Sequence, residues 1–243
     1  MTCTRSSRSA GIGLGAALFA AFAAGGAAAQ DGGAPPAPAP DAPPAPAPDA
    51  PPAPDAPPDP TVGLADGVYA VLETSLGSLV LRLEYQLAPK TCENFVGLAE
   101  GSIEWTDPKT QEKVKKPFYD GLIFHRIIKD FMVQTGCPQG NGMGGPGYCL
   151  PAEFNDLRHE KGVISMAREG HNDNTAGSQF FVVTVATKHL DGQYTGFGRL
   201  VEGQPTLDLL AATPVHPRPA SEGPASDPLT KPKLLGVEPI LLK

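Results

Sequence analysis

Residues 124–136, FHRIIKDFMVQTG, contain an arginine inside an otherwise apolar run. The stretch predicts two strands, within 122–128 and 131–136, joined at Lys129 and Asp130. A permanently charged guanidinium is costly beside a core unless a partner or a substrate uses it. Arg126 is therefore a candidate functional residue, and the competing interpretation is an ion pair with an acid such as Glu153.

Alternation along this stretch divides its side chains between two faces. In a regular strand, Phe131 and Val133 point one way, and Met132 and Gln134 point the other way. A further strand, expected at 178–184, places two more such residues on one face: Gln179 and Phe181. These side chains describe an apolar pocket with a polar rim, and an ordinary core with its rim is an equally good interpretation.

The rest of the domain, 61–243, reads in the same way from periodicity and turn residues. Strands are expected within 68–84, with a turn at 75–78, and at 162–167, 178–184, 196–203 and 234–243. Helices are expected at 88–101, with a buried face of Cys92, Phe95, Val96 and Ala99, and at 204–212. Many short strands, glycine turns and only two helices predict an all-β barrel or sandwich.

The first 60 residues have a different composition. Residues 1–29 contain two arginines, a short apolar run and an A-x-A pattern, which predicts a signal peptide cleaved after Ala29; an uncleaved anchor is the alternative. Residues 30–60 contain half of the 28 prolines with alanine and aspartate, and predict a disordered linker. It is a semi-rigid spacer or an inert tail.

Charge and motif spacing argue against several function classes. The chain has a net charge of −7 and no basic tract, so we expect neither nucleic acid nor anionic lipid as a partner. The five histidines have no metal-ligand spacing, so no metal is expected. NGMGGPG, at 141–147, lacks the lysine of a phosphate loop and does not open a helix. Ser178 has no obvious base and is interpreted as structural.

Five long segments resemble the cyclophilins, which are peptidyl-prolyl cis-trans isomerases. They are FHRIIKDFMVQTG, NGMGGPGY, EFNDLRHEKGVISMA, NTAGSQFFVVT and LDGQYTGFGRLVEG, in matching order over about residues 67–242. The resemblance implies an all-β fold: a closed eight-stranded antiparallel barrel capped by two short helices. The segment EWTDPKTQEKVKKPFYDG, at 104–121, resembles an insertion in some bacterial members.

The resemblance also implies roles for individual residues. The implied catalytic residues are Arg126, Phe131 and Gln134. The implied substrate-binding residues are Met132, Gly142, Ala167, Arg168, Gln179, Phe181, His189, Leu190 and Tyr194. Ala167 and Arg168 match the pair that lines the groove for residues before the proline. This sequence departs from common members at Arg168, usually asparagine, at His189, often tryptophan, and at Tyr194, often histidine. Cyclosporin binding is accordingly expected to be weak.

The function implied is rotation about X–Pro bonds in exported proteins, which assists their folding. This reaction makes and breaks no bond, so no cofactor is expected. The expected partners are proline-containing unfolded or folding polypeptides, the expected state is a monomer, and the expected location is the periplasm, with the medium as the alternative. A proline-peptide binding or chaperone module with little turnover, and a purely structural exported barrel, are the other interpretations.

The cysteines leave a further question. Cys92 lies on the apolar helix face, where a buried thiol is the ordinary explanation. Cys137 and Cys149 flank the glycine-rich loop that contains Gly142. A disulfide between them would tie down this loop, and the alternative is that each replaces a small residue at a strand end.

Overall fold

The computed structural model describes residues 64–170, 172–217 and 225–242. The predicted signal peptide (1–29) and linker (30–60) lie outside these residues. The described residues form the strands β1 (Gly67–Thr74), β2 (Gly77–Leu83), β3 (Trp105–Thr106), β4 (Lys113–Val114), β5 (Leu122–Ile123), β6 (Arg126–Ile128), β7 (Met132–Thr135), β8 (Val163–Met166), β9 (Phe180–Val183), β10 (Gly196–Glu202) and β11 (Lys233–Leu242). They also form two α-helices, α1 (Pro89–Glu100) and α2 (Gln204–Ala211), and two 3-10 turns, η1 (Asp173–Thr175) and η2 (Lys188–Leu190).

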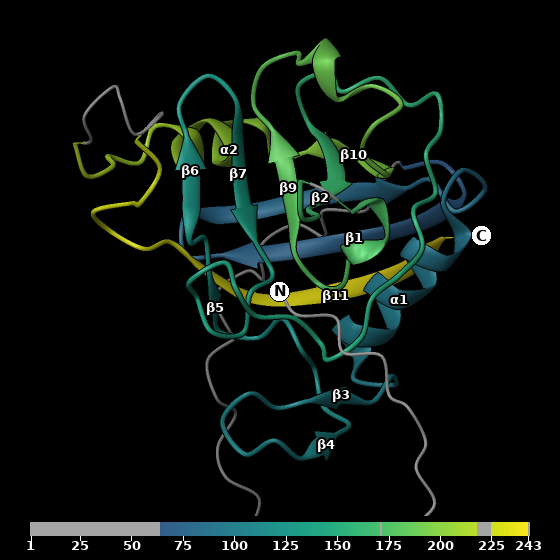
Figure 1. The fold of residues 1–243 in the computed structure, drawn as a ribbon. Helices are drawn as coiled ribbons and strands as arrows, with labels where there is room; N and C mark the ends of the chain where they lie inside the picture. The colour runs from purple at the N-terminus through teal and green to yellow at the C-terminus, as the bar shows by residue number, and fades with distance from the viewer. Residues whose placement is uncertain (1–63, 171, 218–224, 243) are drawn as a thin grey trace, which may run out of the picture. The chain divides into compact units, whose positions relative to one another are not determined.

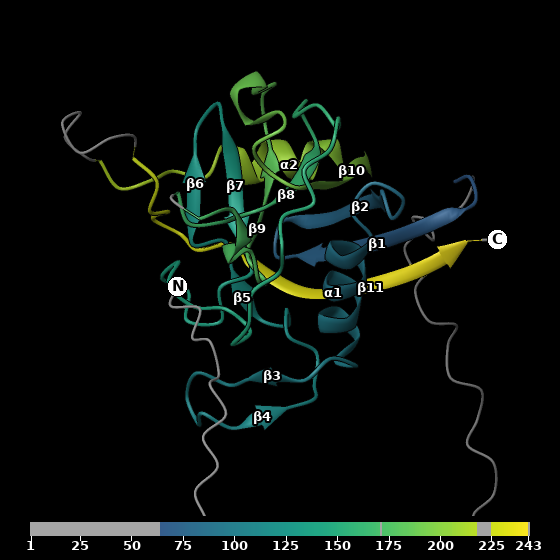
Figure 2. The same ribbon diagram turned by 45° about the vertical axis from the view of Figure 1, so that its right-hand side comes forward.

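Nine strands form one antiparallel sheet in the order β5-β11-β1-β2-β10-β8-β9-β7-β6. In Figure 1, β1, β2 and β11 run across the view while β6, β7 and β9 stand nearly upright in front of them, so the sheet is curled. Figure 2 shows the same arrangement, with α2 above β1 and β2 in the view and α1 beside β11. The all-β class and the two helices are thus as predicted, and the sheet is a curled one of nine strands.

The strand count differs from the predicted eight. The strand expected within 122–128 is divided, because Phe124 and His125 interrupt the ladder between β5 and β6. The two pieces then lie at opposite edges of the sheet order. Pro239, which would be expected to interrupt the strand at 234–243, lies within an unbroken β11. The ladder with β5 reaches only Lys233 and Leu234, so one edge of β11 is unpaired at the proline.

Helix α1 places one aromatic ring at the centre of the core. Phe95 is fully buried, and its ring centroid lies 5.2–5.3 Å from those of Tyr119, Phe180 and Phe197. The helix ends at Gly101, whose φ of +75° is the left-handed conformation that glycine adopts without strain. Cys92 is buried on the same face, as predicted, and burial raises the pKa of its thiol to about 12.

Alternation in β7 puts the core on one face of the sheet and a second apolar cluster on the other. Val133 belongs to the main core, whereas Met132 belongs to a separate cluster with Ile128, Phe181, Val183 and Leu190. Phe131 is an exception to the prediction, because it packs on this second cluster and not on the face of Val133. It precedes β7 and follows Asp130, whose φ of +56° breaks the regular strand.

Cys137 and Cys149 do not form a disulfide with one another, because Cys137 is a free thiol. The possibility of a bridge across the glycine-rich loop is therefore excluded. Its sulfur accepts a hydrogen bond from the Gly144 N–H at 3.3 Å and lies 3.7 Å from Asn141 Oδ1. The glycine-rich loop therefore folds over the thiol.

The segment 104–121 contains a small hairpin that the sequence analysis did not predict. Its strands, β3 and β4, pair Trp105 with Val114 and Thr106 with Lys113. The Trp105 ring is buried edge-on against Phe118, with centroids 4.8 Å apart, and its Nε1–H donates to the Lys116 carbonyl at 3.0 Å. The inserted hairpin is thus anchored to the main core by its tryptophan.

Within the residues that the structure describes, no helix has the length and apolar character needed to span a bilayer.

Candidate active site

A pocket of about 390 Å³ opens on the outer face of β6, β7 and β9. Its floor is the second apolar cluster, to which Met132, Phe181 and Leu190 contribute. The residues that line it are Arg126, Phe131, Met132, Gln134, Ala167, Arg168, Gly170, Phe181, His189, Leu190, Gln193 and Tyr194. All of the sequence-predicted site residues except Gly142 and Gln179 therefore meet in one pocket, which we call the main pocket.

Arg126 reaches this face because alternation in β6 turns Ile127 into the main core. Its Nη1 donates to Gln134 Oε1 at 3.1 Å, across the β6–β7 pair. Among the described residues it has no carboxylate partner, so its other N–H groups are free to bind a ligand. Partial burial lowers the pKa of the guanidinium, but its ordinary value is so high that it stays charged.

The alternative interpretation of Arg126, an ion pair with Glu153, is wrong. The Glu153 carboxylate accepts from the N–H groups of Lys90 and Thr91 at 3.1 and 2.8 Å, and from the Thr91 hydroxyl at 2.7 Å. Lys90 and Thr91 lie in the first turn of α1, whose N-cap residue, Ala88, has no side chain that could cap the helix. Glu153 therefore caps α1 from a distant part of the chain.

The two predicted glutamines form a relay that leads from Arg126 to the glycine-rich loop. Gln134 Nε2 donates to Gln179 Oε1 at 2.9 Å. Gln179 Nε2 in turn donates to the carbonyls of Gly142 and Gly144 at 2.9 and 2.7 Å. Both glutamines are buried, so the relay fixes the orientation of the amides and of the loop backbone.

A second pocket of about 330 Å³ adjoins the first one, and we call it the adjoining pocket. It shares Gln134, Ala167, Arg168 and Gly170 with the main pocket. Gly142 and Gln179, the remaining predicted residues, line it together with Met143 and Glu169. The predicted site residues are therefore distributed over two connected pockets.

Arg168 forms the wall between the two pockets. Its guanidinium lies 4.6 Å from the centroid of the Tyr194 ring, and its Nε donates to the Gln193 carbonyl at 3.1 Å. Its Nη1 lies 3.4 Å from the Asp173 carboxylate. Tyr194 also packs edge-on against Phe181, with centroids 5.8 Å apart. Arg168 and Tyr194 thus contact one another.

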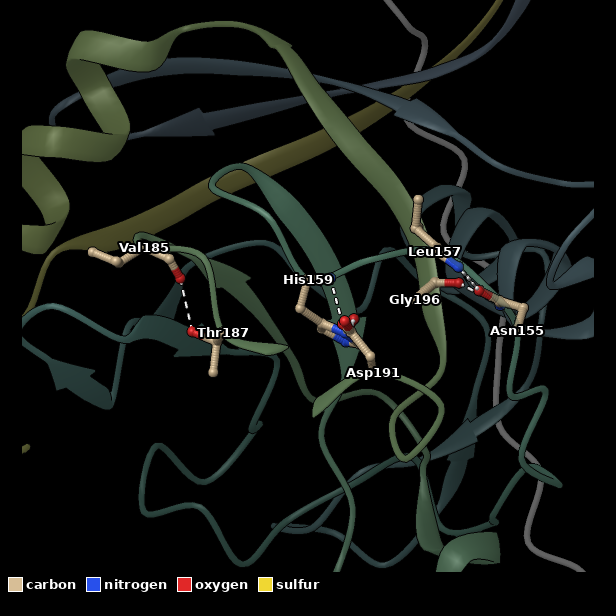
Figure 3. Close-up of polar contacts among 8 residues, drawn as sticks. Asn155, Leu157, His159, Val185, Thr187, Asp191 and Gly196 are labelled. Carbon is tan, nitrogen blue, oxygen red and sulfur yellow. Dashed lines mark hydrogen bonds and ion pairs between the residues drawn. The ribbon is translucent and has the colours of Figure 1, made fainter. Parts of the chain in front are cut away.

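The far wall of the main pocket rests on a buried polar network. His159 lies beneath η2, which contains His189 and Leu190, and its backbone N–H and ring Nδ1 contact Asp191 Oδ1 at 2.8 and 3.0 Å. Figure 3 shows the imidazole and the carboxylate facing each other. The His159 carbonyl accepts from the Thr187 N–H at 2.8 Å, so both ends of η2 are fixed.

The His159 ring also connects this wall to the pocket floor. Its Nε2 contacts the Ser165 hydroxyl at 2.8 Å, and its ring stacks on Phe181 with centroids 6.4 Å apart. Burial lowers the pKa of His159. The neutral tautomer with its proton on Nδ1 matches these contacts, because it donates to Asp191 and accepts from Ser165.

This network and several lining residues were not predicted from the sequence. Gly170, Gln193, Met143 and Glu169 lie in loops next to predicted residues, so adjacency in the sequence was the only sign of them. His159 and Asp191 are far apart in the sequence, and no spacing pattern connects them.

Comparison with known proteins identifies the family. The family model for cyclophilin type peptidyl-prolyl cis-trans isomerases matches residues 69–231. Peptidyl-prolyl cis-trans isomerase B of Streptomyces anulatus is 44% identical over 159 residues, which are 64% of this chain and 90% of that protein. The Helicobacter pylori peptidyl-prolyl cis-trans isomerase is 42% identical over 151 residues, which are 60% and 82% of the two chains.

A solved structure gives the same result. The Cryptosporidium parvum cyclophilin, crystallised in the presence of the dipeptide Ala-Pro, matches with a TM-score of 0.59 and 28% identity over 72% of this chain and 99% of that one. The segments that form the two pockets lie inside the matched region. On these grounds, the chain belongs to the cyclophilin-type peptidyl-prolyl cis-trans isomerases.

Proposed function

We propose that the isomerase acts on X–Pro bonds whose proline ring occupies the main pocket. The observation that carries this proposal is the position of Arg126, which is held by Gln134 at the edge of an apolar floor and has no carboxylate partner in the described chain. The proposal is also supported by the Cryptosporidium parvum relative, whose crystal structure was determined in the presence of the dipeptide Ala-Pro.

The chemistry follows from the amide bond. Resonance gives the X–Pro bond a rotation barrier of about 18–20 kcal/mol. In the twisted state the proline nitrogen becomes pyramidal and gains a lone pair. The free N–H groups of Arg126 donate to that lone pair and stabilise the twist, as a preorganised donor does.

The other residues hold the two sides of the rotating bond. Phe131, Met132, Phe181 and Leu190 enclose the proline ring and exclude water. The Gln134 amide, fixed by its contacts with Arg126 and Gln179, binds the neighbouring carbonyl while the other side rotates. The carbonyl and the ring are thus held by separate groups.

The alternative function is that of a proline-peptide binding or chaperone module with little turnover. The free guanidinium favours catalysis, because binding alone needs no donor aimed at the amide nitrogen. The test is the refolding of a protein that is limited by a cis-proline. We expect the protein to accelerate the slow phase, and Arg126→Ala to bind the client without accelerating it. Equal effects of both forms would favour the binding module.

We propose further that the protein is exported and assists folding in the periplasm, with residues 1–29 as signal peptide, 30–60 as linker and 61–243 as the isomerase domain. The support is the sequence pattern of residues 1–60. Fractionation and N-terminal sequencing test this proposal. We expect a periplasmic protein that begins at Gln30; a cytoplasmic protein that retains residues 1–29 would contradict it.

We also propose that the curled sheet closes into an eight-stranded barrel when β5 and β6 are counted as one interrupted strand. Its two edges are separated by only two residues of the chain. The Ile127 N–H donates to the Ser226 carbonyl and the Phe124 N–H to the Pro232 carbonyl, at 2.8 and 2.9 Å, which connects this strand with the segment that leads into β11. Slow hydrogen exchange at Phe124 and Ile127 would support closure, and exchange at the rate of an exposed loop would contradict it.

A further inference from the structure

A third pocket, of about 230 Å³, lies between the inserted hairpin and the glycine-rich loop. We propose that this hairpin pocket is a substrate subsite, which binds an uncharged side chain of the polypeptide well before the X–Pro bond. The inference rests on the proposed function of the main pocket and deepens it. It assigns a binding role to the insertion at 104–121.

The hairpin pocket is continuous with the proposed substrate groove. The main and adjoining pockets share four lining residues. The adjoining pocket and the hairpin pocket meet at Met143, which lines both and whose surface is 64% exposed. A polypeptide with its proline in the main pocket, and the preceding residues beside Arg168, is thus directed past Met143 toward the hairpin.

The walls of the hairpin pocket are held in place on both sides. On the hairpin side, the Thr106 N–H donates to the Pro146 carbonyl at 2.9 Å, and Trp105 is anchored in the core. On the loop side, Gln179 holds the Gly144 carbonyl. The Gln179 amide therefore fixes the backbone of the loop that borders both the adjoining pocket and the hairpin pocket. These two pockets thus keep a fixed position relative to one another.

The chemistry of the lining indicates the class of side chain that fits. Pro108 and Gln111 come from the hairpin, and Met143, Pro146 and Tyr148 come from the loop. None of the described residues that line this pocket has a charged side chain. A charged side chain of the substrate would lose hydration there without gaining a partner, whereas an apolar side chain gains from burial.

Gly145 offers a way to block the pocket. It lines the hairpin pocket, its φ is not in the left-handed region, and a Cβ added to it meets no atom within 4 Å. Because Gly145 lines the pocket, we expect Gly145→Phe to place its ring there without a backbone clash. Lys109→Ala is the matched control, because Lys109 is exposed on the same hairpin and does not line the pocket.

The experiment compares kcat/KM for an X–Pro tetrapeptide with that for the same peptide extended at its N-terminus by about four apolar residues, roughly 13 Å of chain. We expect the extended peptide to be about fivefold better, through a lower KM, because the subsite is remote from the twisting bond. A lysine or glutamate in the extension should remove the gain. Gly145→Phe should remove it too, and Lys109→Ala should keep it.

The outcomes separate this inference from the proposed function. Equal kcat/KM for the two peptides, or a gain that survives Gly145→Phe, overturns the subsite. Failure of the unaltered protein to turn over the tetrapeptide overturns the proposed function instead. Should Gly145→Phe not fold, NMR of the unaltered protein decides: the Gln111 side-chain amide should shift with the extended peptide and not with the tetrapeptide, and an unchanged signal overturns the subsite.

Discussion

His189 and Tyr194 give the main pocket a different rim from that of common cyclophilins. The His189 ring stacks on Phe131, with centroids 5.8 Å apart and planes 29° apart, and it is exposed. The Tyr194 ring lies between Phe181 and the Arg168 guanidinium. An imidazole at position 189 covers less apolar area than an indole, and it presents its ring nitrogens differently.

We therefore predict weak inhibition by cyclosporin. The inhibition constant should exceed that of tryptophan-bearing relatives by at least about tenfold, which is roughly 1.4 kcal/mol. His189→Trp should recover part of this difference. Lys188→Trp, at the exposed neighbouring position, is the control and should not. Tight inhibition of the unaltered protein, measured by titration of its isomerase activity, would contradict the prediction.

Among the secondary-structure elements, helix α1 depends on a side chain outside itself. The Glu153 carboxylate binds two N–H groups and one hydroxyl in the first turn of the helix. We expect Glu153→Ala to lower the free energy of unfolding by about 1–2 kcal/mol, since it removes the cap, and to leave kcat almost unchanged. Urea denaturation measures this loss, with Glu160→Ala at an exposed position as control. An unchanged midpoint would show that the cap contributes little.

The position of the turn η2 depends on contacts with a distant residue as well, namely those between Asp191 and His159. Asp191→Ala removes the acceptor for two N–H groups, so the wall with His189 and Leu190 should loosen. We expect KM for a proline peptide to rise about tenfold, with a smaller change in kcat, while Asp191→Asn retains an acceptor oxygen and stays close to the unaltered protein. If Asp191→Ala and Asp191→Asn are equally impaired, the charge and not the hydrogen bonds is responsible.

At the scale of the whole molecule, the features that could be predicted from the sequence are those that depend on local periodicity. The strands and helices, and the opposite faces of Met132 and Val133, follow from apolar alternation and turn residues. The orientation of Phe131 did not follow from this alternation, because Asp130, directly before it, has a positive φ that breaks the regular strand.

The contacts between residues far apart in the chain could not be predicted from the sequence. An ion pair of Glu153 with Arg126 was the alternative interpretation, but Glu153 caps α1. A disulfide between Cys137 and Cys149 was left open, but Cys137 is a free thiol that contacts its own loop. Each choice depends on how distant segments meet in the fold, and charge or spacing alone does not decide between partners. The division into β5 and β6 likewise depends on where the ladder with β11 ends.

Two buried histidines should make the stability of the whole domain depend on pH. Burial, and then repulsion from Arg126, lower the pKa of His125 to about 4. Among the residues that the structure describes, neither ring nitrogen has a hydrogen-bond partner, and weaker polar interactions with Ile123 and Gln179 act on the pKa in the opposite direction. Burial lowers the pKa of His159 as well. Between about pH 6.5 and 4 the unfolded chain thus binds protons that the folded one does not, so stability falls with falling pH.

From pH 7 to pH 4.5, His125 alone should lower the free energy of unfolding by about 2–3 kcal/mol. Urea denaturation at the two pH values measures this change. His125→Gln should reduce the loss, whereas His216→Gln, at an exposed histidine, should not. An NMR titration that places the pKa of His125 near 6.5 would contradict the prediction.

The catalytic role of Arg126 is tested most directly by the rate of X–Pro isomerisation in a tetrapeptide, measured for the unaltered protein, Arg126→Ala and Arg126→Lys. Urea denaturation of each variant serves as the control for folding. Removal of one preorganised donor should lower kcat/KM by roughly 10²–10³-fold in Arg126→Ala. Arg126→Lys should also lose most of the activity, because an ammonium lacks the planar array of donors. A folded Arg126→Ala protein with nearly full activity would contradict the account.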